Sequence, residues 1–378
     1  MKDERIRVGV VGAGIISDIY LKNMTGRFAD VLDVRCICSA RMESARRRAS
    51  QYDLQAVTLE DMLRDPSVQM VVNLTPTPAH EDIIRRALEA GKHVYTEKTL
   101  TGDYGSASAL SALAREKGLR LGSAPDTFLG AALQTARRAV DSGLLGTVQS
   151  FAIAANRDNR LLTPFYRFLN LPRGGAGYDY AVYYLTALVS LLGPVAQAAA
   201  VVRTPYPTHI DLNPAFETFG KPIPTPNESQ LMGVLRLTSG AAGTLHFNHD
   251  SAMDDQAFFA LYGTEGILYL PDPNGFGGPV RFLPAGKDFE DHPAPRTLDG
   301  PFDFSDNSRG LGPADMARAI LENRPHRASA EMACHVLETV DALMESGRTQ
   351  TFVDLRSTCA RPEPLPPGEA IGATGCNT

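Results

Sequence analysis

One segment near the N-terminus indicates the fold class of this chain: Ile6-Arg7-Val8-Gly9-Val10-Val11-Gly12-Ala13-Gly14-Ile15-Ile16-Ser17. Its apolar run predicts a buried strand, and the residues after Gly14 predict the start of a helix. Glycine at position 12 permits a tight turn, and glycine at position 14 lets backbone N–H groups approach a pyrophosphate. Ser17 replaces the motif's third glycine and is small enough for the helix to pack on the strand. We expect dinucleotide contacts from Gly12, Gly14, Ile15 and Ile16; the alternative is a strand–helix turn without a ligand.

Residues 1–124 continue this alternation of strands and helices. After the first strand, strand-like runs occur at 33–39, 70–74, 93–96 and 120–123, and helical patterns at 15–28, 42–52, 79–90 and 104–117. Strands that alternate with helices predict parallel βαβ units. We therefore expect residues 1–124 to form an α/β Rossmann domain with a doubly wound parallel sheet that binds NAD(P).

Residues 125–378 follow a different pattern. Strand-like segments lie at 149–155, 196–202, 231–237, 243–248, 256–262 and 266–270, and helical segments at 130–142, 178–192, 313–323 and 328–346. Turns rich in Gly and Pro separate most of these strands, which predicts an α+β domain with a large, mostly antiparallel open sheet. We expect this domain to carry the substrate site or a subunit interface, and we expect the proline-rich segment 205–226 to be a long loop.

The composition narrows the class of protein. A length of 378 residues fits two domains. A net charge of −6 argues against a general nucleic-acid binder. No apolar run reaches the roughly 18 residues that span a bilayer, and the N-terminus lacks an apolar leader. The five cysteines are an odd number, so we expect no disulfide framework. These features favour a cytoplasmic protein without a membrane partner.

The end of the second predicted strand bears on the choice of cofactor. It reads Cys38-Ser39-Ala40-Arg41, with no carboxylate before Glu43. A carboxylate here would bind the ribose hydroxyls of NAD and repel the 2′-phosphate of NADP. Ser39 offers a hydrogen bond and Arg41 a bidentate pair to that phosphate. NADP is therefore preferred and NAD is the alternative, in which Arg41 is a solvated residue at a helix start.

Several spaced motifs resemble those of one enzyme family. They are Thr75-Pro76-x-x-x-His80, Ala90-Gly91-Lys92-His93-Val94-x-x-Glu97-Lys98, Ser123-Ala124-Pro125-Asp126-Thr127-Phe128, Gly174-Gly175-Ala176-Gly177-Tyr178-Asp179 and Tyr262-Gly263-Thr264-Glu265-Gly266. The set is similar to that of the glucose–fructose oxidoreductase / inositol dehydrogenase / MocA (Gfo/Idh/MocA) family. The resemblance implies a Rossmann domain, a C-terminal domain that binds substrate and assembles a homodimer or homotetramer, and hydride exchange with sugars or cyclic polyols.

The resemblance also implies catalytic residues. Family members commonly use the Lys of a Glu-Lys-Pro motif and the Asp and His of an Asp-x-Gly-x-His motif. The first motif here reads Glu97-Lys98-Thr99, and the second runs from Asp179 to Tyr183 with Ala181 in place of glycine. Lys98 and Asp179 carry over, and Tyr183 stands at the His position, which Tyr also occupies in some members.

The chemistry supports the same three residues. Oxidation of a secondary alcohol removes a hydride, which the cofactor takes, and a proton, which an acid/base group must take. A tyrosine has a pKa of about 10, and a neighbouring lysine ammonium would lower it. Asp179 precedes Tyr183 by four residues and would share a helix face with it. The alternative is a packed aromatic pair, Tyr183 and Tyr184, beside a helix-start aspartate.

The remaining candidates are contacts to cofactor or substrate. For the cofactor we expect Thr75, Pro76, His80, Glu97 and Lys98, with a structural cap as the alternative for His80. For the substrate we expect Asp126, Arg157, Tyr166, Tyr184 and His249. No cluster of Cys and His has the spacing of a zinc site, so no metal is expected.

Together these features predict an NAD(P)-dependent oxidoreductase acting on a sugar, a sugar derivative or a cyclic polyol. A second hypothesis is a non-catalytic sensor that binds dinucleotide and a protein partner, since the resembled family includes a transcriptional co-repressor and a fold does not fix a function. A third is an enzyme whose cofactor stays bound between an oxidation and a later reduction.

Overall fold

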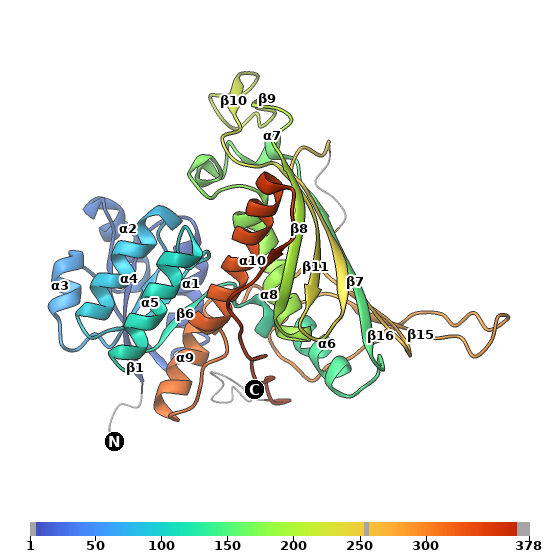
Figure 1. Ribbon diagram of the computed structural model, residues 1–378. Coiled ribbons are helices and arrows are strands. Elements are labelled where there is room, and N and C mark those ends of the chain that lie inside the picture. The colour runs from blue at the N-terminus through green and yellow to red at the C-terminus, as the bar shows by residue number, and fades with distance from the viewer. Residues whose placement is uncertain (1–4, 253–256, 369–378) are drawn as a thin grey trace. The chain divides into compact units, whose positions relative to one another are not determined.

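The computed structural model describes residues 5–252 and 257–368 (Figure 1). It divides into two compact units. The first joins the chain up to Gly130 with Phe302–Cys334 and a segment that starts at Leu365, and the second joins Ala131–Pro301 with His335–Pro364. The sequence predicts a single domain boundary after residue 124. In the structure, residues 302–334 also belong to the first unit. No helix in the described ranges is long and apolar enough to cross a bilayer.

The first unit contains the predicted doubly wound sheet. Its strands lie in the order β3-β2-β1-β4-β5-β6, and all neighbours pair in parallel. The strands are β1 (Ile6–Val11), β2 (Leu32–Cys38), β3 (Gln55–Ala56), β4 (Met70–Asn73), β5 (His93–Thr96) and β6 (Leu121–Ser123). The helices between them are α1 (Ile16–Thr25), α2 (Met42–Tyr52), α3 (Leu59–Arg64), α4 (His80–Glu89) and α5 (Tyr104–Glu116). All four residues of β4 are buried, as expected for a strand with both faces covered.

The position of β1 determines where a ligand can bind. β1 pairs with β2 on one side, where Val8 lies opposite Val34, and with β4 on the other, where Val8 lies opposite Met70. The chain thus continues to one side of β1 first and later crosses to the other. Open α/β sheets bind ligands at the carboxyl ends of strands where the strand order reverses in this way. The turn at Gly12 lies at this point.

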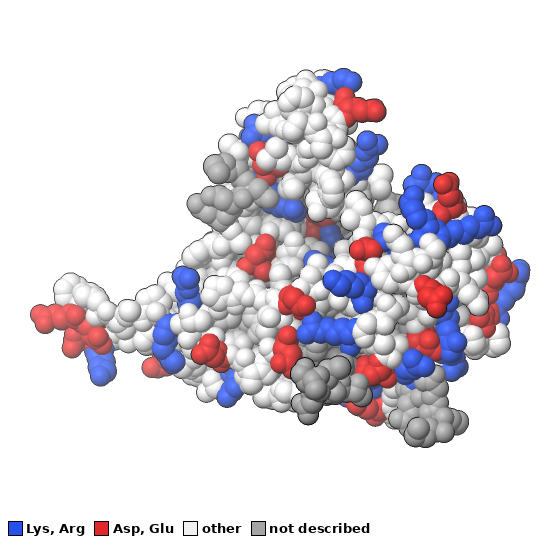
Figure 2. Space-filling view, turned by 180° about the vertical axis from the view of Figure 1, so that it is seen from behind, with Lys and Arg blue, Asp and Glu red and all other residues white. Residues whose placement is uncertain are grey.

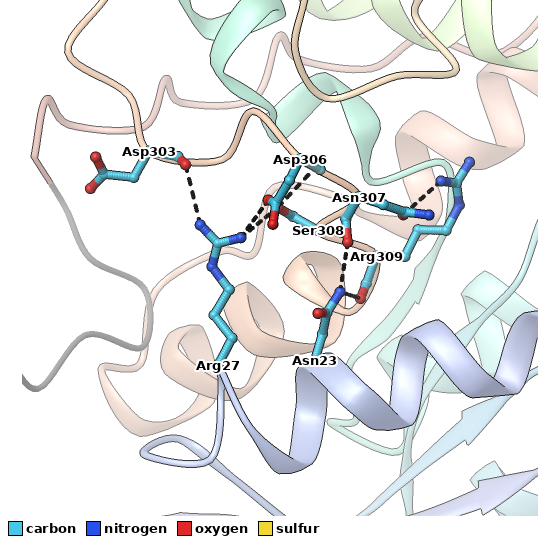
Figure 3. Close-up of polar contacts among 7 residues, drawn as sticks. All are labelled: Asn23, Arg27, Asp303, Asp306, Asn307, Ser308 and Arg309. Atoms are coloured by element: carbon cyan, nitrogen blue, oxygen red, sulfur yellow. Dashed lines mark hydrogen bonds and ion pairs between the residues drawn. The ribbon is translucent and has the colours of Figure 1, made fainter. Parts of the chain in front are cut away.

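Two sets of polar contacts attach residues 302–334 to the sheet unit. Figure 3 shows that Asn23 of α1 donates hydrogen bonds to the backbone oxygens of Asn307 and Arg309, at 2.9 and 2.8 Å. In the same view Arg27 donates to the carboxylate of Asp306 at 2.6 Å and to the Ser308 hydroxyl at 2.9 Å. The segment therefore has a fixed path before it enters the next helix.

Asp126 caps that next helix, α9 (Leu311–Leu321). One of its carboxylate oxygens accepts hydrogen bonds from the backbone N–H groups of Gly310 and Gly312, at 3.1 and 3.0 Å. A carboxylate at this end of a helix interacts favourably with the helix dipole. The side chain is nevertheless only 1% exposed, and this burial raises its pKa from 3.8 to about 6.

The second unit is built on a nine-stranded sheet in the order β16-β15-β14-β13-β7-β12-β11-β8-β17. β7 and β12 pair in parallel and the other neighbours in antiparallel orientation, so the predicted mostly antiparallel sheet is confirmed. The strands are β7 (Val148–Asn156), β8 (Val195–Arg203), β11 (Gln230–Leu237), β12 (Ala242–Asn248), β13 (Phe258–Gly263), β14 (Gly266–Leu270), β15 (Val280–Pro284), β16 (Arg296–Leu298) and β17 (Val353–Asp354).

Helices cover one face of this sheet. They are α6 (Ala131–Asp141), α8 (Val182–Leu192) and the later turns of α10 (Ala330–Thr349), with the short α7 (Asn159–Leu162) beyond the end of β7 (Figure 1). Phe151, Ile153 and Ala155 of β7 are buried and alternate with half-buried residues, which is the pattern of a strand with one covered face.

The proline-rich segment 205–226, which the sequence predicts to be a long loop, contains two short strands. β9 (Thr208–Ile210) and β10 (Pro222–Pro224) form a separate two-stranded antiparallel pair within it. Proline lacks a backbone N–H, so it is tolerated where a strand has an edge facing no partner. Both strands of this pair have such an edge, which is why two prolines fit in β10.

Charged side chains are mixed on the surface. Figure 2 shows Lys and Arg interspersed with Asp and Glu over the face that it displays. This distribution agrees with the small net charge of −6.

The buried carboxyl of Asp126 predicts a pH-dependent stability. Its pKa is higher in the folded chain, at about 6, than the ordinary 3.8. Between these values the folded chain keeps a proton that the unfolded chain has lost, so the free energy of unfolding falls as the pH rises through this window. The fall amounts to about 3 kcal/mol and is complete above about pH 6.

Urea unfolding followed by circular dichroism at several pH values between 4 and 7.5 measures this effect. Asp126→Asn keeps an oxygen acceptor for the helix but does not titrate, so its free energy of unfolding should fall less over the window. Glu116→Gln, on the exposed side of α5, is the matched control. Identical pH profiles for the two variants would contradict the assignment.

Candidate functional site

The glycine turn after β1 has the geometry of a phosphate-binding loop. Gly12 has φ +110°, and an added Cβ would lie 2.8 Å from the backbone carbon and oxygen of Leu74, so only glycine fits. An added Cβ at Gly14 meets no atom within 4 Å, which leaves open space for a ligand beside the backbone. The Ser17 hydroxyl donates to the Gly14 oxygen at 2.6 Å. Ile16 is half-buried, and Ile15 is 65% exposed next to this open space.

The end of β2 lies on the other side of the same turn. Ser39 is half-buried, and Arg41 is exposed immediately before α2. Arg48 of α2, which the sequence did not single out, pairs with Asp18 and reaches to 3.4 Å from the Gly14 oxygen. Its signal in the sequence is weak, because Arg48 stands among three consecutive arginines on a polar helix.

A hydrogen-bond network occupies the carboxyl ends of β4 and β5. The Asn73 side chain accepts from the Thr75 hydroxyl at 2.8 Å and donates to the Thr96 hydroxyl at 3.0 Å. Its backbone oxygen accepts from the Glu97 N–H at 2.8 Å. Two adjacent strand ends are thereby held together, and Thr75 and the exposed Pro76 begin the next turn from a fixed position.

Glu97 links this network to Lys98 and to α1. One carboxylate oxygen accepts from the Tyr20 hydroxyl at 2.7 Å, and the other accepts from the Lys98 backbone N–H at 3.1 Å. Burial and the nearby Glu97 charge raise the pKa of Tyr20. Lys98 is half-buried, and its peptide bond to Thr99 is cis. Tyr20 was missed because it lies among the apolar residues of α1 and resembles a core position.

His80 joins two loops of this edge. The ring is fully buried, with Nδ1 2.6 Å from the Thr99 oxygen and Nε2 2.7 Å from the Thr75 oxygen. Burial lowers the pKa of the imidazole. His80 therefore ties the turn at Thr75 to the residue that follows Lys98. Asp126, predicted as a substrate contact, is buried beneath α9 as its cap.

In the second unit several predicted residues surround the ring of Tyr180. The Arg157 guanidinium lies over that ring, 4.4 Å from its centre, and 3.7 Å from the carboxylate of Asp179. The centres of the Tyr183 and His249 rings lie 6.2 and 5.9 Å from that of Tyr180. The π-helical turn η4 (Ala176–Ala181) and the first turn of α8 provide Asp179 and the tyrosines.

Access to solvent differs within this cluster. Asp179 and His249 are buried, at 6% and 1% exposure, and Tyr184 is fully buried against Tyr180 and Phe247. Tyr183 and Arg157 are half-buried and keep part of their surface open. Tyr180 donates to Asp272 at 2.8 Å, a pair that the sequence did not predict.

Tyr166 lies in a second aromatic cluster. Its ring centre is 4.7 Å from that of Phe165 and 5.8 Å from that of Phe168, and Phe165 also contacts Phe216. No group of three or more His, Cys, Asp or Glu side chains in the described ranges could hold a metal ion.

Comparison with protein families agrees with this geometry. Residues 6–124 match the oxidoreductase family with an NAD-binding Rossmann fold, and residues 133–269 match the GFO/IDH/MocA C-terminal domain. Among solved structures, levoglucosan dehydrogenase in complex with NADH has the same fold, with a TM-score of 0.79 and 21% identity, over 93% of this chain and 100% of that one.

Two curated relatives illustrate the likeness in sequence. The dTDP-3,4-didehydro-2,6-dideoxy-alpha-D-glucose 3-reductase of Streptomyces violaceoruber is 30% identical over 74% of this chain and 81% of its own length. The scyllo-inositol 2-dehydrogenase (NADP(+)) IolW of Bacillus subtilis is 26% identical over 53% of this chain and 56% of its own. The chain spans about half the length of several curated relatives that it matches. By both domain matches and the reductase likeness, the chain belongs to the Gfo/Idh/MocA oxidoreductase family.

Proposed function

We propose that this protein is an NAD(P)-dependent dehydrogenase or reductase that acts on a sugar, a sugar derivative or a cyclic polyol. The observation that carries the proposal is the combination, in one family member, of two features. One is an open glycine turn at the point where the strand order reverses, and the other is Glu97, two strands away, which accepts a hydrogen bond from the backbone N–H of Lys98. The named sugar reductase and inositol dehydrogenase among its relatives support the substrate class.

The residues of the first unit fit a dinucleotide. The N–H groups of the Gly12–Gly14 turn, at the start of α1, would hold the pyrophosphate. An added Cβ at Gly14 would meet no atom within 4 Å, which supports this placement. Thr75, Pro76, Glu97 and Lys98 lie at the carboxyl ends of β4 and β5 and would contact the nicotinamide half. When bound, the nicotinamide supplies or accepts the hydride.

The proton is assigned to Tyr183. Its phenol is half-buried on the first turn of α8 and would exchange a proton with the substrate oxygen. Lys98 would stabilise negative charge on that oxygen and favour the phenolate. Asp179, with the Arg157 guanidinium 3.7 Å away, would accept a hydrogen bond from a substrate hydroxyl.

NADP is the proposed cofactor, on the strength of Ser39 and Arg41. The exposed Arg41 is available to a 2′-phosphate, and Ser39 adds a donor at the end of β2. The relatives include an enzyme named for NADP(+) and one named for NAD(+). The preference for NADP therefore rests on Ser39 and Arg41.

Assembly and location are further parts of the proposal. Val201 of β8, Val234 of β11 and Phe258 of β13 are 57%, 39% and 40% exposed, and the strand register puts them on the open face of the nine-stranded sheet. Exposed apolar residues gathered on one face favour contact with another subunit. We propose that the protein is cytoplasmic and forms a homodimer or homotetramer. Size-exclusion chromatography with light scattering would measure the oligomeric state.

Removal of either catalytic side chain should abolish most turnover. Lys98→Ala and Tyr183→Phe are expected to lower kcat by about 100-fold to 10,000-fold, the usual contribution of acid/base catalysis, with little change in cofactor affinity. Tyr262→Phe, a half-buried tyrosine of β13, is the matched control. Absorbance of the reduced nicotinamide reports turnover on a panel of pyranoses, aldonates and inositols.

Full activity in the Lys98→Ala variant would refute the mechanism. Cofactor binding by the unmodified protein, without turnover on any member of the panel and with specific capture of a protein partner, would favour a sensor instead of an enzyme.

Arg41 should discriminate between the two dinucleotides. Arg41→Ala is expected to weaken NADP binding by about tenfold or more, the effect of losing a charge-assisted hydrogen bond, and to leave NAD binding nearly unchanged. Arg46→Ala, on the exposed side of α2, is the control for a general loss of positive charge. Fluorescence titration of the reduced cofactors measures both constants, and an equal loss for NADPH and NADH would rule out a 2′-phosphate contact.

A further inference from the structure

A cavity of about 290 Å³ opens within the first unit. Its walls are the last turns of α5, the residues that lead into β6, and residues 325–331 before and within the start of α10. Its polar side chains include Arg115, Arg120, His326, Ser329 and Glu331, and its other wall is apolar. Ligand pockets commonly start at about 300 Å³, so this cavity suits a small metabolite and is too small for a dinucleotide.

The cavity lies at the opposite edge of the sheet from the glycine turn. Arg120 directly precedes β6, at the amino end of that strand, whereas Gly12 directly follows the carboxyl end of β1. Because all six strands are parallel, amino and carboxyl ends lie at opposite edges. The cavity therefore belongs to neither the cofactor nor the hydride-transfer residues.

The wall formed by residues 326–329 is rigidly placed. Ser329 bridges to Gly122 of β6, and the Ser123 N–H donates to the Ala328 oxygen at 3.2 Å. An added Cβ at Gly122 would lie 2.6 Å from that oxygen and 3.0 Å from the His326 ring, so glycine is needed for this approach. The cavity is thus formed before any ligand arrives, which lowers the cost of binding.

Fully buried Asp315 fixes the same segment from behind. Its carboxylate accepts from the Arg327 backbone N–H at 2.7 Å and from the Arg327 guanidinium at 2.5 Å. It also accepts from Arg324 at 3.1 Å. These two arginines are therefore neutralised within the protein and do not compete for a ligand in the cavity.

Arg120 is different from the other arginines of this region. Arg115 lies 3.8 Å from Glu331, so their charges offset each other. The Arg120 guanidinium is half-buried, and within residues 5–252 and 257–368 no carboxylate forms an ion pair with it. Burial lowers the pKa of His326, against the opposing effect of the nearby Asp315 charge. Among the described residues that line the cavity, Arg120 is thus the positive charge that no ion pair offsets.

We propose that this cavity binds a small organic anion, a carboxylate or a phosphate monoester, with Arg120 as its charged partner. The first N–H groups of α10, which begins at Ala330, add favourable potential for an anion at the same wall. Ser111 and Ser329 offer hydroxyls, and Ala114, Leu119 and Pro325 suit a short carbon body. The inference does not rest on the proposed oxidoreductase activity.

Isothermal titration calorimetry of the full-length protein at low ionic strength tests the proposal. The probes are inorganic phosphate, gluconate and glucose 6-phosphate, with glucose as the neutral control, each with and without saturating NADP. At least one anionic probe should bind at one site per chain, glucose should not bind there, and saturation with NADP should leave the anion's affinity unchanged. Arg120→Gln should weaken binding about tenfold or more, the effect expected for one charge-assisted hydrogen bond.

Two control variants make the result decisive. Arg138→Gln removes an exposed arginine from α6 and should leave the affinity unchanged. Arg120→Lys keeps the charge and should bind more tightly than Arg120→Gln, and circular dichroism verifies that each variant folds. The proposal is overturned if no anionic probe binds, if Arg120→Gln binds as tightly as the unmodified protein, or if NADP displaces the anion, which would place it at the glycine turn.

Discussion

The parallel pairing of β1 with β2 on one side and β4 on the other is the constraint on which the functional edge depends. It puts the carboxyl ends of β1, β4 and β5 at one edge, so residues far apart in sequence follow neighbouring strands there. Glycine is required at position 12 because a Cβ there would lie only 2.8 Å from the backbone of Leu74. Asn73 then ties β4 to β5, and Glu97 ties Lys98 to α1. One backbone arrangement thus positions both the proposed phosphate site and the proposed catalytic lysine.

Two buried aspartates extend that arrangement to the C-terminal part of the chain. Burying a carboxylate is unfavourable unless hydrogen bonds or opposite charges compensate it. Asp126 has two backbone N–H donors at the start of α9, and Asp315 has two arginines and a backbone N–H. Burial raises the pKa of Asp126 to about 6, although its two backbone donors and the nearby Arg309 charge act to lower it. The contacts of Asp315 with Arg324 and Arg327 also hold the segment that forms one wall of the cavity beside β6.

The sequence predicted the long periodic elements well, because an amphipathic helix or a buried parallel strand leaves a regular pattern. It did not predict β3, α3, α7, the β9–β10 pair or the strands β15, β16 and β17, most of which are too short or too rich in proline to show periodicity. The glycine and lysine motifs both lie at the carboxyl ends of parallel strands, where we propose the cofactor site. Partners such as Tyr20, Arg48 and Asp272 were not foreseen, because their contacts join residues 30 or more positions apart and nothing local marks them. His80 and Asp126 were recognised as notable residues, but their backbone partners became visible only in three dimensions.

Three tyrosines, Tyr180, Tyr183 and Tyr184, lie within five residues, and their surroundings differ in how well they suit proton exchange with a substrate. A phenol that exchanges a proton with a substrate needs an exposed oxygen and an environment that tolerates the phenolate. Tyr184 is fully buried and Tyr180 donates its hydrogen to Asp272, and burial together with neighbouring negative charge raises the pKa of both. Neither meets the requirement. Tyr183 alone of the three keeps part of its surface open, which supports its proposed role as the group that exchanges the proton.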